Sequence, residues 1–226
     1  MIRQLKVNGL WSYRDFDLCI SKKTVSLPKK KSIKETVPFS NKIYDFSKID
    51  GEIYFEEREV SITFDIIDFN PIDFEKQKSK IVNWLMNIHD SDIYLDYYPG
   101  FHFHGSYDDN SWSEDFDNGE LTVKFKVYPY LVSNDYKIFD IETEANIERT
   151  FEIVNNSSHP IAPVIITDSS IKIEYNNYIY ELQEGTYQDK ETQNDDDFKF
   201  ESGINKIKIL SDSDANVCFK FKEEVL

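Results

Sequence analysis

Two histidines separated by a single residue are the clearest candidate for metal chemistry in this sequence. His102 and His104 stand at positions i and i+2, so in a strand both rings would project from one face. Zinc sites use three or four protein ligands, however, and Cys19 and Cys218 are remote in sequence while Asp96 lies across a turn. We therefore expect ordinary strand residues and no bound metal. A metal-dependent enzyme, with zinc held by this pair, is the alternative.

Two groups of acidic residues match cation sites only in part. Asp115, Asp117 and Gly119 alternate as in a calcium loop, but such a loop needs glycine at its sixth position and glutamate at its twelfth. Here Gly119 is fifth and Lys126 is twelfth, which favours a hairpin turn. The run Asp195–Asp197, near Glu191, is typical of a solvated loop.

Motifs that mark common catalytic or nucleotide-binding sites are missing from the sequence. It contains no G-x-S-x-G elbow, no phosphate-binding G-x-x-x-x-G-K-[ST] loop and no G-x-G-x-x-G turn. None of its four histidines lies in a recognisable nucleophile setting. We expect a protein that is not an enzyme, with no catalytic residues and no cofactor.

The net charge of −16 over 226 residues argues against a protein that grips nucleic acid through its phosphates. An acidic wall would instead repel the phosphate backbone and let DNA slide past, although simple solubility explains the charge equally well. The sequence holds no apolar run of about 18 residues, so we expect no membrane span. The N-terminal residues carry no apolar secretion signal either, which predicts synthesis in the cytoplasm.

Lysines in this acidic chain concentrate between residues 21 and 38. No acidic residue occurs from Leu18 to the last of six lysines, which are Lys22, Lys23, Lys29, Lys30, Lys31 and Lys34. Pro28 and Pro38 interrupt the segment, which predicts an exposed excursion between two strands. It lacks the interleaved aromatic residues expected of a nucleic-acid surface. A solvated loop and an arm that reaches an acidic neighbouring subunit remain as alternatives.

Hydrophobic alternation predicts strands in the first part of the chain. A turn at Asn8-Gly9 separates a short strand from a second one through Phe16, Leu18 and Ile20. Further strands have one apolar face each, formed by Val60, Ile62, Phe64 and Ile66 and by Leu121, Val123, Phe125 and Val127.

One amphipathic helix is predicted between these strands. Asn70 is a suitable N-cap, Pro71 fits the first helical position, and an apolar stripe follows with Phe74, Ile81, Leu85 and Ile88. The region after the helix predicts two hairpins, so this part of the chain is β-rich.

The second part shows no helical periodicity. Short strands alternate with turn signals such as Asn176-Asn177, which indicates an antiparallel sandwich. The expected strands are Glu148–Val154, Ala162–Thr167, Ser170–Tyr175, Tyr178–Leu182, Phe198–Phe200, Lys206–Leu210 and Val217–Lys222. The polar stretch from Leu131 to Asn146 marks the boundary, so we expect two domains, at residues 1–135 and 145–226.

Tyrosines of this second domain raise an alternative function. Tyr175, Tyr178 and Tyr180 fall on neighbouring predicted strands, and exposed tyrosines could stack on sugar rings. A carbohydrate-binding sandwich that recognises host cell-surface glycans is therefore a second hypothesis. The competing interpretation is that these rings belong to the core or to cross-strand pairs.

The order of motifs resembles the distal tail (Dit) proteins of long-tailed bacteriophages. A Trp84-Leu85 pair closes the helix, an acidic and aromatic turn follows at Asp96–Gly100, and Phe101–His104 forms an aromatic strand. Pro129-Tyr130 then ends the domain, and Gly203-x-Asn205 stands before a terminal strand. The resemblance extends along nearly the whole chain and rests on order and spacing.

This resemblance implies a mainly β fold. The N-terminal domain would be a tail-tube-like β-sandwich with one flanking α-helix, followed by a galectin-like antiparallel β-sandwich. Six copies would close into a hexameric ring at the tail tip of a virion, prophage or phage-tail-like particle, made in the bacterial host cytoplasm. The ring would join the tail tube protein to the tail-associated fibre or lysin protein and to peripheral proteins such as a receptor-binding protein, and DNA would pass through it without specific binding.

The resemblance also places a loop of the basic segment in the contact around the ring. The candidate interface residues are Lys29, Lys30, Lys31, Lys34, Pro38 and Phe39. This chain departs from the family at Val37–Ser40, where the usual proline-glycine-arginine motif is replaced.

Overall fold

A computed structural model describes residues 3–36, 38–39, 41–47, 53–66, 71–114, 119–188 and 198–226. The expectations for Val37, Ser40, Asn70, Asp115, Asp117, Glu191 and Asp195–Asp197 lie outside these residues. Internal contacts divide the chain into two units, Met1–Leu131 together with Leu226, and Val132–Val225. Within the described residues, no helix is long and apolar enough to cross a membrane.

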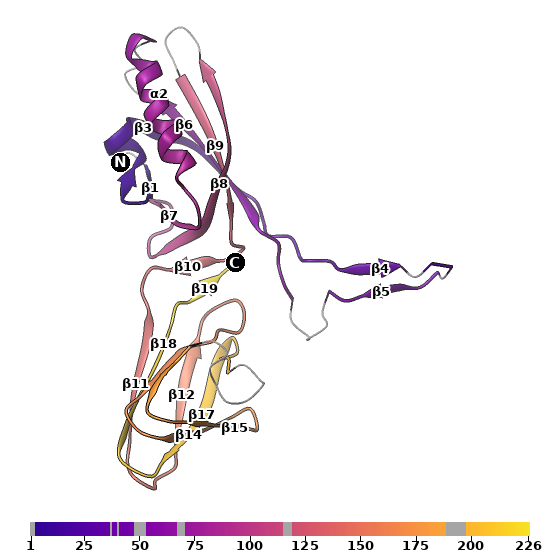
Figure 1. The fold of residues 1–226 in the computed structure, drawn as a ribbon, viewed down its shortest axis with the longest axis vertical. Coiled ribbons are helices and arrows are strands. Elements are labelled where there is room, and N and C mark those ends of the chain that lie inside the picture. Colours follow the sequence, from indigo (N-terminus) through magenta and orange to yellow (C-terminus); the bar gives the residue numbers. More distant parts are fainter. Residues whose placement is uncertain are drawn as a thin grey trace. The chain divides into compact units, whose positions relative to one another are not determined.

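The first unit is built on an antiparallel sheet whose main path runs β2-β1-β7-β8-β9-β6-β3 (Figure 1). These strands are β1 (Leu5–Val7), β2 (Leu10–Trp11), β3 (Leu18–Val25), β6 (Arg58–Ile66), β7 (Ser91–Leu95), β8 (Phe101–Glu114) and β9 (Gly119–Val127). The central pair, β6 and β9, is in register from Arg58↔Val127 to Ile66↔Gly119. The apolar face predicted for each of these two strands is buried, because alternate side chains point to the same side of a strand.

The predicted helix is present as α2 (Pro71–Met86). Its Ile81 and Leu85 are buried, and the ring of Trp84 stacks on Phe16 with centroids 4.5 Å apart. Phe16 belongs to a second helix, α1 (Ser12–Phe16), which ends at Asp17 in the left-handed conformation. Leu18 and Ile20 lie in a strand as predicted, but Phe16, which we expected in the same strand, ends a short helix, since five residues cannot show a helical period.

The second unit is a sandwich of two four-stranded antiparallel sheets, in the orders β11-β18-β13-β16 and β12-β17-β14-β15. Its strands are β11 (Lys137–Thr143), β12 (Arg149–Asn155), β13 (Val164–Thr167), β14 (Ile171–Tyr175), β15 (Tyr178–Leu182), β16 (Gly185–Tyr187), β17 (Gly203–Ser211) and β18 (Ala215–Phe221). Two short strands, β10 (Leu131–Ser133) and β19 (Glu224–Val225), pair with each other. The mainly β fold with an antiparallel sandwich is confirmed.

Three features of the second unit differ from the sequence prediction. Strand β11 lies in the stretch that we expected to be a linker, and β16 was not expected. Phe198–Phe200 forms only a single bridge, from Phe200 to Ile161, instead of a strand. The first difference has a clear cause: only Ile141 and Thr143 of β11 are fully buried, so its outward Asp140 and Glu142 make the segment look like a loop.

Two predicted asparagine turns are confirmed by positive φ angles. Asn8 and Gly9 have φ of 50° and 79°, and Asn176 and Asn177 have φ of 50° and 66°. Positive φ at both central residues is what a type I′ hairpin requires, and Asn and Gly adopt it with the least strain.

Candidate subunit interface

A two-stranded arm leaves the sheet of the first unit between β3 and β6. We define the arm as the described residues between these two strands, namely 26–36, 38–39, 41–47 and 53–57. Its two legs are joined by backbone bonds: Ser26 N–H donates to the Glu59 carbonyl (3.0 Å), Glu56 N–H to that of Lys29 (2.7 Å), and Phe46 N–H to that of Ile33 (2.8 Å). The basic segment therefore forms an ordered ribbon rather than an irregular loop (Figure 1).

The distal part of the arm is a β-hairpin of β4 (Lys34–Thr36) and β5 (Ile43–Asp45). Lys34 pairs with Asp45 and Thr36 with Ile43. Phe39, near the connection between the two strands, has a φ of 64° and a fully exposed ring. The arm thus presents a large aromatic side chain to solvent, on a backbone conformation that favours glycine.

All six candidate interface residues lie on this arm. Lys29, Lys30, Lys31, Lys34, Pro38 and Phe39 are each exposed. The other two lysines of the basic segment do not join them, because Lys22 and Lys23 are part of strand β3. The Nζ of Lys23 donates to the Tyr98 hydroxyl at 2.9 Å. The excursion that we expected from residue 21 therefore begins after Val25.

Apolar residues of the arm were missed by the sequence prediction. Large apolar or aromatic side chains are exposed along it, namely Leu27, Ile33, Phe39, Ile43, Tyr44, Phe46, Ile53 and Tyr54. The signal in the sequence that could have revealed them is the recurrence of apolar residues along this lysine-rich segment. Exposed apolar side chains beside the lysines of the first leg suit a protein contact better than free solvation.

The arm is attached to the unit by an aromatic contact. The ring of Phe55 meets that of Tyr130 edge-on, with centroids 5.9 Å apart, and Tyr130 is buried. Beyond this root, β4 and β5 pair only with each other among the described residues. An isolated two-stranded hairpin is marginally stable in water. The arm thus presents two unpaired strand edges and gains stability wherever a partner covers it.

His102 and His104 have different surroundings, although both lie in β8. His102 is buried, whereas His104 is partly exposed, with its two ring nitrogens 2.8 Å from Asp90 and Asp92. Hydrogen bonding to Asp92 raises the pKa of His104 above its ordinary value; partial burial opposes the shift and Asp90 adds to it. No group of three or more potential metal ligands occurs in the described part of the chain.

The three tyrosines proposed to bind glycans do not share a surface. Tyr175 and Tyr180 are buried in the core of the second unit, and only Tyr178 is exposed. The Tyr175 hydroxyl donates to Oδ1 of Asn205 at 2.5 Å. Tyr178 lies on the same face of β15 as Tyr180, but it is the first residue of the strand, beside the Asn176-Asn177 turn, and its side chain is exposed there. The three rings therefore form no shared exposed face for a sugar.

Comparison with known proteins finds similarity only at the level of structure. No family model matches the sequence, and no curated protein matches it. The chain is similar to the crystal structure of SPP1 Dit (gp 19.1), described as a paradigm of the hub adsorption apparatus in phages that infect Gram-positive bacteria. The TM-score is 0.70 at 12% identity, with 98% of this chain and 99% of that chain covered.

A second similarity is to the phage p2 baseplate in its activated conformation with Sr, at 8% identity and a TM-score of 0.40 over 98% of both chains. The SPP1 similarity includes both units, and it confirms the resemblance to Dit proteins as a likeness of fold.

Proposed function

We propose that this chain is a structural hub protein of a phage tail tip and that its arm forms one side of the contact between neighbouring subunits. The observation that carries the proposal is the arm, which exposes lysines and apolar side chains on a chain with the fold of a Dit protein. A cyclic ring joins two different patches of neighbouring copies, so each protomer needs a projecting surface and a receiving one. The arm, with its basic first leg and exposed apolar side chains, has the first character.

Charge supports the same assignment. The chain has a net charge of −16, yet Lys29, Lys30 and Lys31 follow one another on the arm. Residues 26–57 hold six lysines and six acidic residues, so only the leg from Ser26 to Lys34 is basic. This leg is attracted to an acidic surface of a second copy, and the attraction steers association and fixes its register. The receiving surface would be acidic, and the apolar side chains of the arm would supply burial in the contact.

In this proposal the protein acts through its geometry and not as an enzyme. Six copies would form the ring, as in the family that the sequence resembles. The first unit would join the tail tube protein to the tail-associated fibre or lysin protein, and the second would hold peripheral proteins such as a receptor-binding protein. The acidic surface would let DNA pass through the ring without binding it.

The test compares ring assembly by the wild type with ring assembly by variants that lack side chains of the arm. Light scattering coupled to size exclusion, followed by negative-stain microscopy, would be applied to the protein alone and mixed with its tail tube protein. We expect rings from the wild type, and their loss in Phe39→Ser and in the triple variant K29Q/K30Q/K31Q.

The matched control is K172Q/K206Q/K208Q, which removes the same charge from exposed lysines of the second unit. Rings that persist in both arm variants would refute the role of the arm. A wild type that forms no ring even with the tail tube protein would refute the hub assignment.

A further inference from the structure

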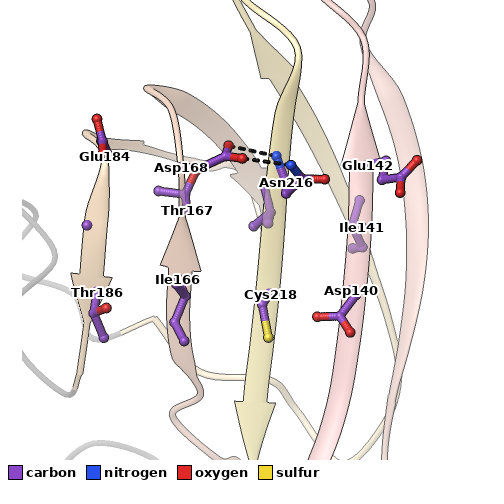
Figure 2. Close-up of a pocket in the computed structure, with 12 residues that line it drawn as sticks. Asp140, Ile141, Glu142, Ile166, Thr167, Asp168, Glu184, Thr186, Asn216 and Cys218 are labelled. Atoms are coloured by element: carbon purple, nitrogen blue, oxygen red, sulfur yellow. Dashed lines mark hydrogen bonds between the residues drawn. The ribbon is translucent and has the colours of Figure 1, made fainter.

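The outer face of one sheet in the second unit is a groove of about 790 Å³. This sheet has the order β11-β18-β13-β16, and its inner side chains, such as Ile141, Ile165 and Phe219, are in the core. The alternate side chains point outward into the groove (Figure 2).

The strand register arranges the groove in two parallel rows. One row crosses all four strands, and its residues lie opposite one another in the order Asp140, Cys218, Ile166 and Thr186. In the next row Glu142 faces Asn216, Asn216 bonds Asp168, and Glu184 lies beyond. Carboxylates thus occupy both sides of the groove, while Cys218 and the partly exposed Ile166 form an apolar middle (Figure 2).

The groove carries negative charge without a matching cation. Every charged side chain that lines it is acidic, and these residues are Asp140, Glu142, Asp168 and Glu184. No ion pair with lysine or arginine involves them in the described part of the chain. Lys220, two residues after Cys218 on the same face, has its Nζ 4.0 Å from the ring centre of Tyr136, and its charge also acts on Cys218. Asp168 is held ionised, since hydrogen bonds from Asn216 lower the pKa of its carboxyl.

On the opposite sheet of the same sandwich, the acidic side chains form ion pairs with lysines. Its acids are matched by lysines on neighbouring strands: Glu181 with Lys172 at 2.7 Å, Glu174 with Lys208 at 3.2 Å, and Glu152 with Lys206 at 3.2 Å. Both sheets expose carboxylates, but among the described residues those of the groove form no ion pair with a lysine or arginine. An uncompensated acidic face attracts a cationic partner.

The dimensions of the groove determine what kind of cation fits. Neighbouring strands are about 4.8 Å apart, so the carboxylates at β11 and Glu184 beside β16 are separated by roughly 14 Å. One metal ion cannot bridge that distance, and no group of three potential ligands is present among the described residues. An extended polypeptide of about five residues spans it, at about 3.3 Å per residue. None of the described residues that line the groove is aromatic, so they offer a sugar no stacking surface.

We propose that this groove binds an extended, lysine- or arginine-rich segment of another tail protein across the strands. Basic side chains reach the carboxylates on both sides, and their aliphatic stems pack on Ile166 and Cys218. The inference rests on the proposed function, in which the second unit holds peripheral proteins, and it names the chemistry by which they are held.

The test uses a fluorescein-labelled peptide of alternating lysine and glycine, nine residues long, with a glutamate-glycine peptide as the negative probe. We expect fluorescence anisotropy to show binding of the lysine peptide alone. In the variant D140N/E142Q/E184Q the affinity should fall about tenfold, since exposed charge pairs each contribute a modest amount. Asp168 is left intact because it bonds Asn216.

The matched control is E152Q/E174Q/E181Q, which removes the same charge from the paired face. Its affinity for the lysine peptide should stay within about twofold of wild type. An equal loss in both variants would show general attraction to an acidic protein and would overturn the proposal, as would a wild type that does not bind.

Cys218 gives a second readout on the wild-type protein. It lies in the middle of the groove, whereas Cys19 lies in β3 of the first unit. Burial, with a smaller effect of Asp140, raises the pKa of the Cys218 thiol, so alkylation would be followed at mildly alkaline pH. Saturating lysine peptide should slow alkylation of Cys218 at least several-fold and leave Cys19 unchanged. Equal rates with and without peptide would overturn the proposal.

The groove variant also distinguishes peptide binding in the groove from formation of the ring. If D140N/E142Q/E184Q still forms rings but no longer binds the peptide, the groove serves a different protein, as proposed. If the variant loses self-assembly, the occupant is a second copy of this chain and the proposal is overturned. A wild type that forms no ring even with the tail tube protein would contradict the hub function, while peptide binding would stay measurable on the single chain.

Discussion

His104 and Asp92 form a charged pair across two neighbouring strands, with Nδ1 of the imidazole 2.8 Å from Oδ1 of the carboxylate. The second ring nitrogen lies 2.8 Å from Asp90. A neutral imidazole has only one N–H, so it can satisfy only one of these acceptors, whereas the imidazolium satisfies both. The geometry therefore favours the protonated form.

This pair predicts a pH-dependent contribution to stability. The pKa of His104 is raised above 6.5 in the folded state, first by Asp92 and then, against partial burial, by Asp90. The folded protein holds the proton more tightly than the unfolded chain, so the stabilisation is complete below pH 6.5 and is lost as pH rises through the folded-state pKa. The difference in melting temperature between wild type and His104→Asn should be larger at pH 5.5 than at pH 8.5.

An NMR titration of the His104 ring gives the direct check. Asp92→Asn should lower its pKa more than Asp90→Asn does, because the bond to Asp92 is the largest cause of the shift. A pKa that does not move in either variant would contradict this account.

Asn205 is expected to be a strong determinant of stability in the second unit. This buried side chain donates to the carbonyls of Ile153, Glu201 and Gly203 and accepts from Tyr175. Asn205→Ala would leave these groups unsatisfied, and we expect a loss of about 2–4 kcal/mol in the free energy of unfolding. Exposed Asn156, which donates to Glu223, is the control, and its alanine variant should stay within about 0.5 kcal/mol. Equal effects in chemical denaturation would contradict the prediction.

Gly105 should tolerate no larger residue. A Cβ at this position would lie 2.2 Å from the carbonyl oxygen of Lys126 and 2.7 Å from the Cα of Val127, both backbone atoms of β9. Because a strand must shift to admit the methyl group, Gly105→Ala should cost roughly 1–3 kcal/mol or more. Thermal unfolding would measure the loss against Ser111→Ala, a change on an exposed residue of the same strand. A melting temperature equal to that of the control would refute the close approach.

Limited proteolysis should show whether a neighbouring subunit covers the arm in the assembled protein. Lys29, Lys30, Lys31 and Lys34 are exposed on a ribbon with few backbone partners, so trypsin should cut the unassembled protein there first. Lys206 and Lys208 lie in β17, a central strand, and should resist. Assembly should protect the arm sites. Cleavage at the same rate in rings and in single chains would show that the arm is not part of the contact.

Much of the fold could be predicted from local patterns. Alternation from Val60 to Ile66 and from Leu121 to Val127 predicted strands that are indeed buried on one face. Pro71 and the apolar stripe after it predicted α2, and Asn176-Asn177 predicted the turn between β14 and β15. These signals depend only on residues near one another in the chain, so they can be read without knowing the fold.

Only the tertiary structure decided which residues share a surface. The sequence by itself determined that Tyr178 and Tyr180 share one face of a strand, but the packing of two sheets decided that Tyr180 is covered while Tyr178, at the end of the strand, is exposed. It determined that Asp140 and Glu184 are acidic, but strand order placed them on opposite sides of one groove. The physical reason is that strand order and register are set by contacts between distant segments, and these contacts leave no periodic trace in either segment alone.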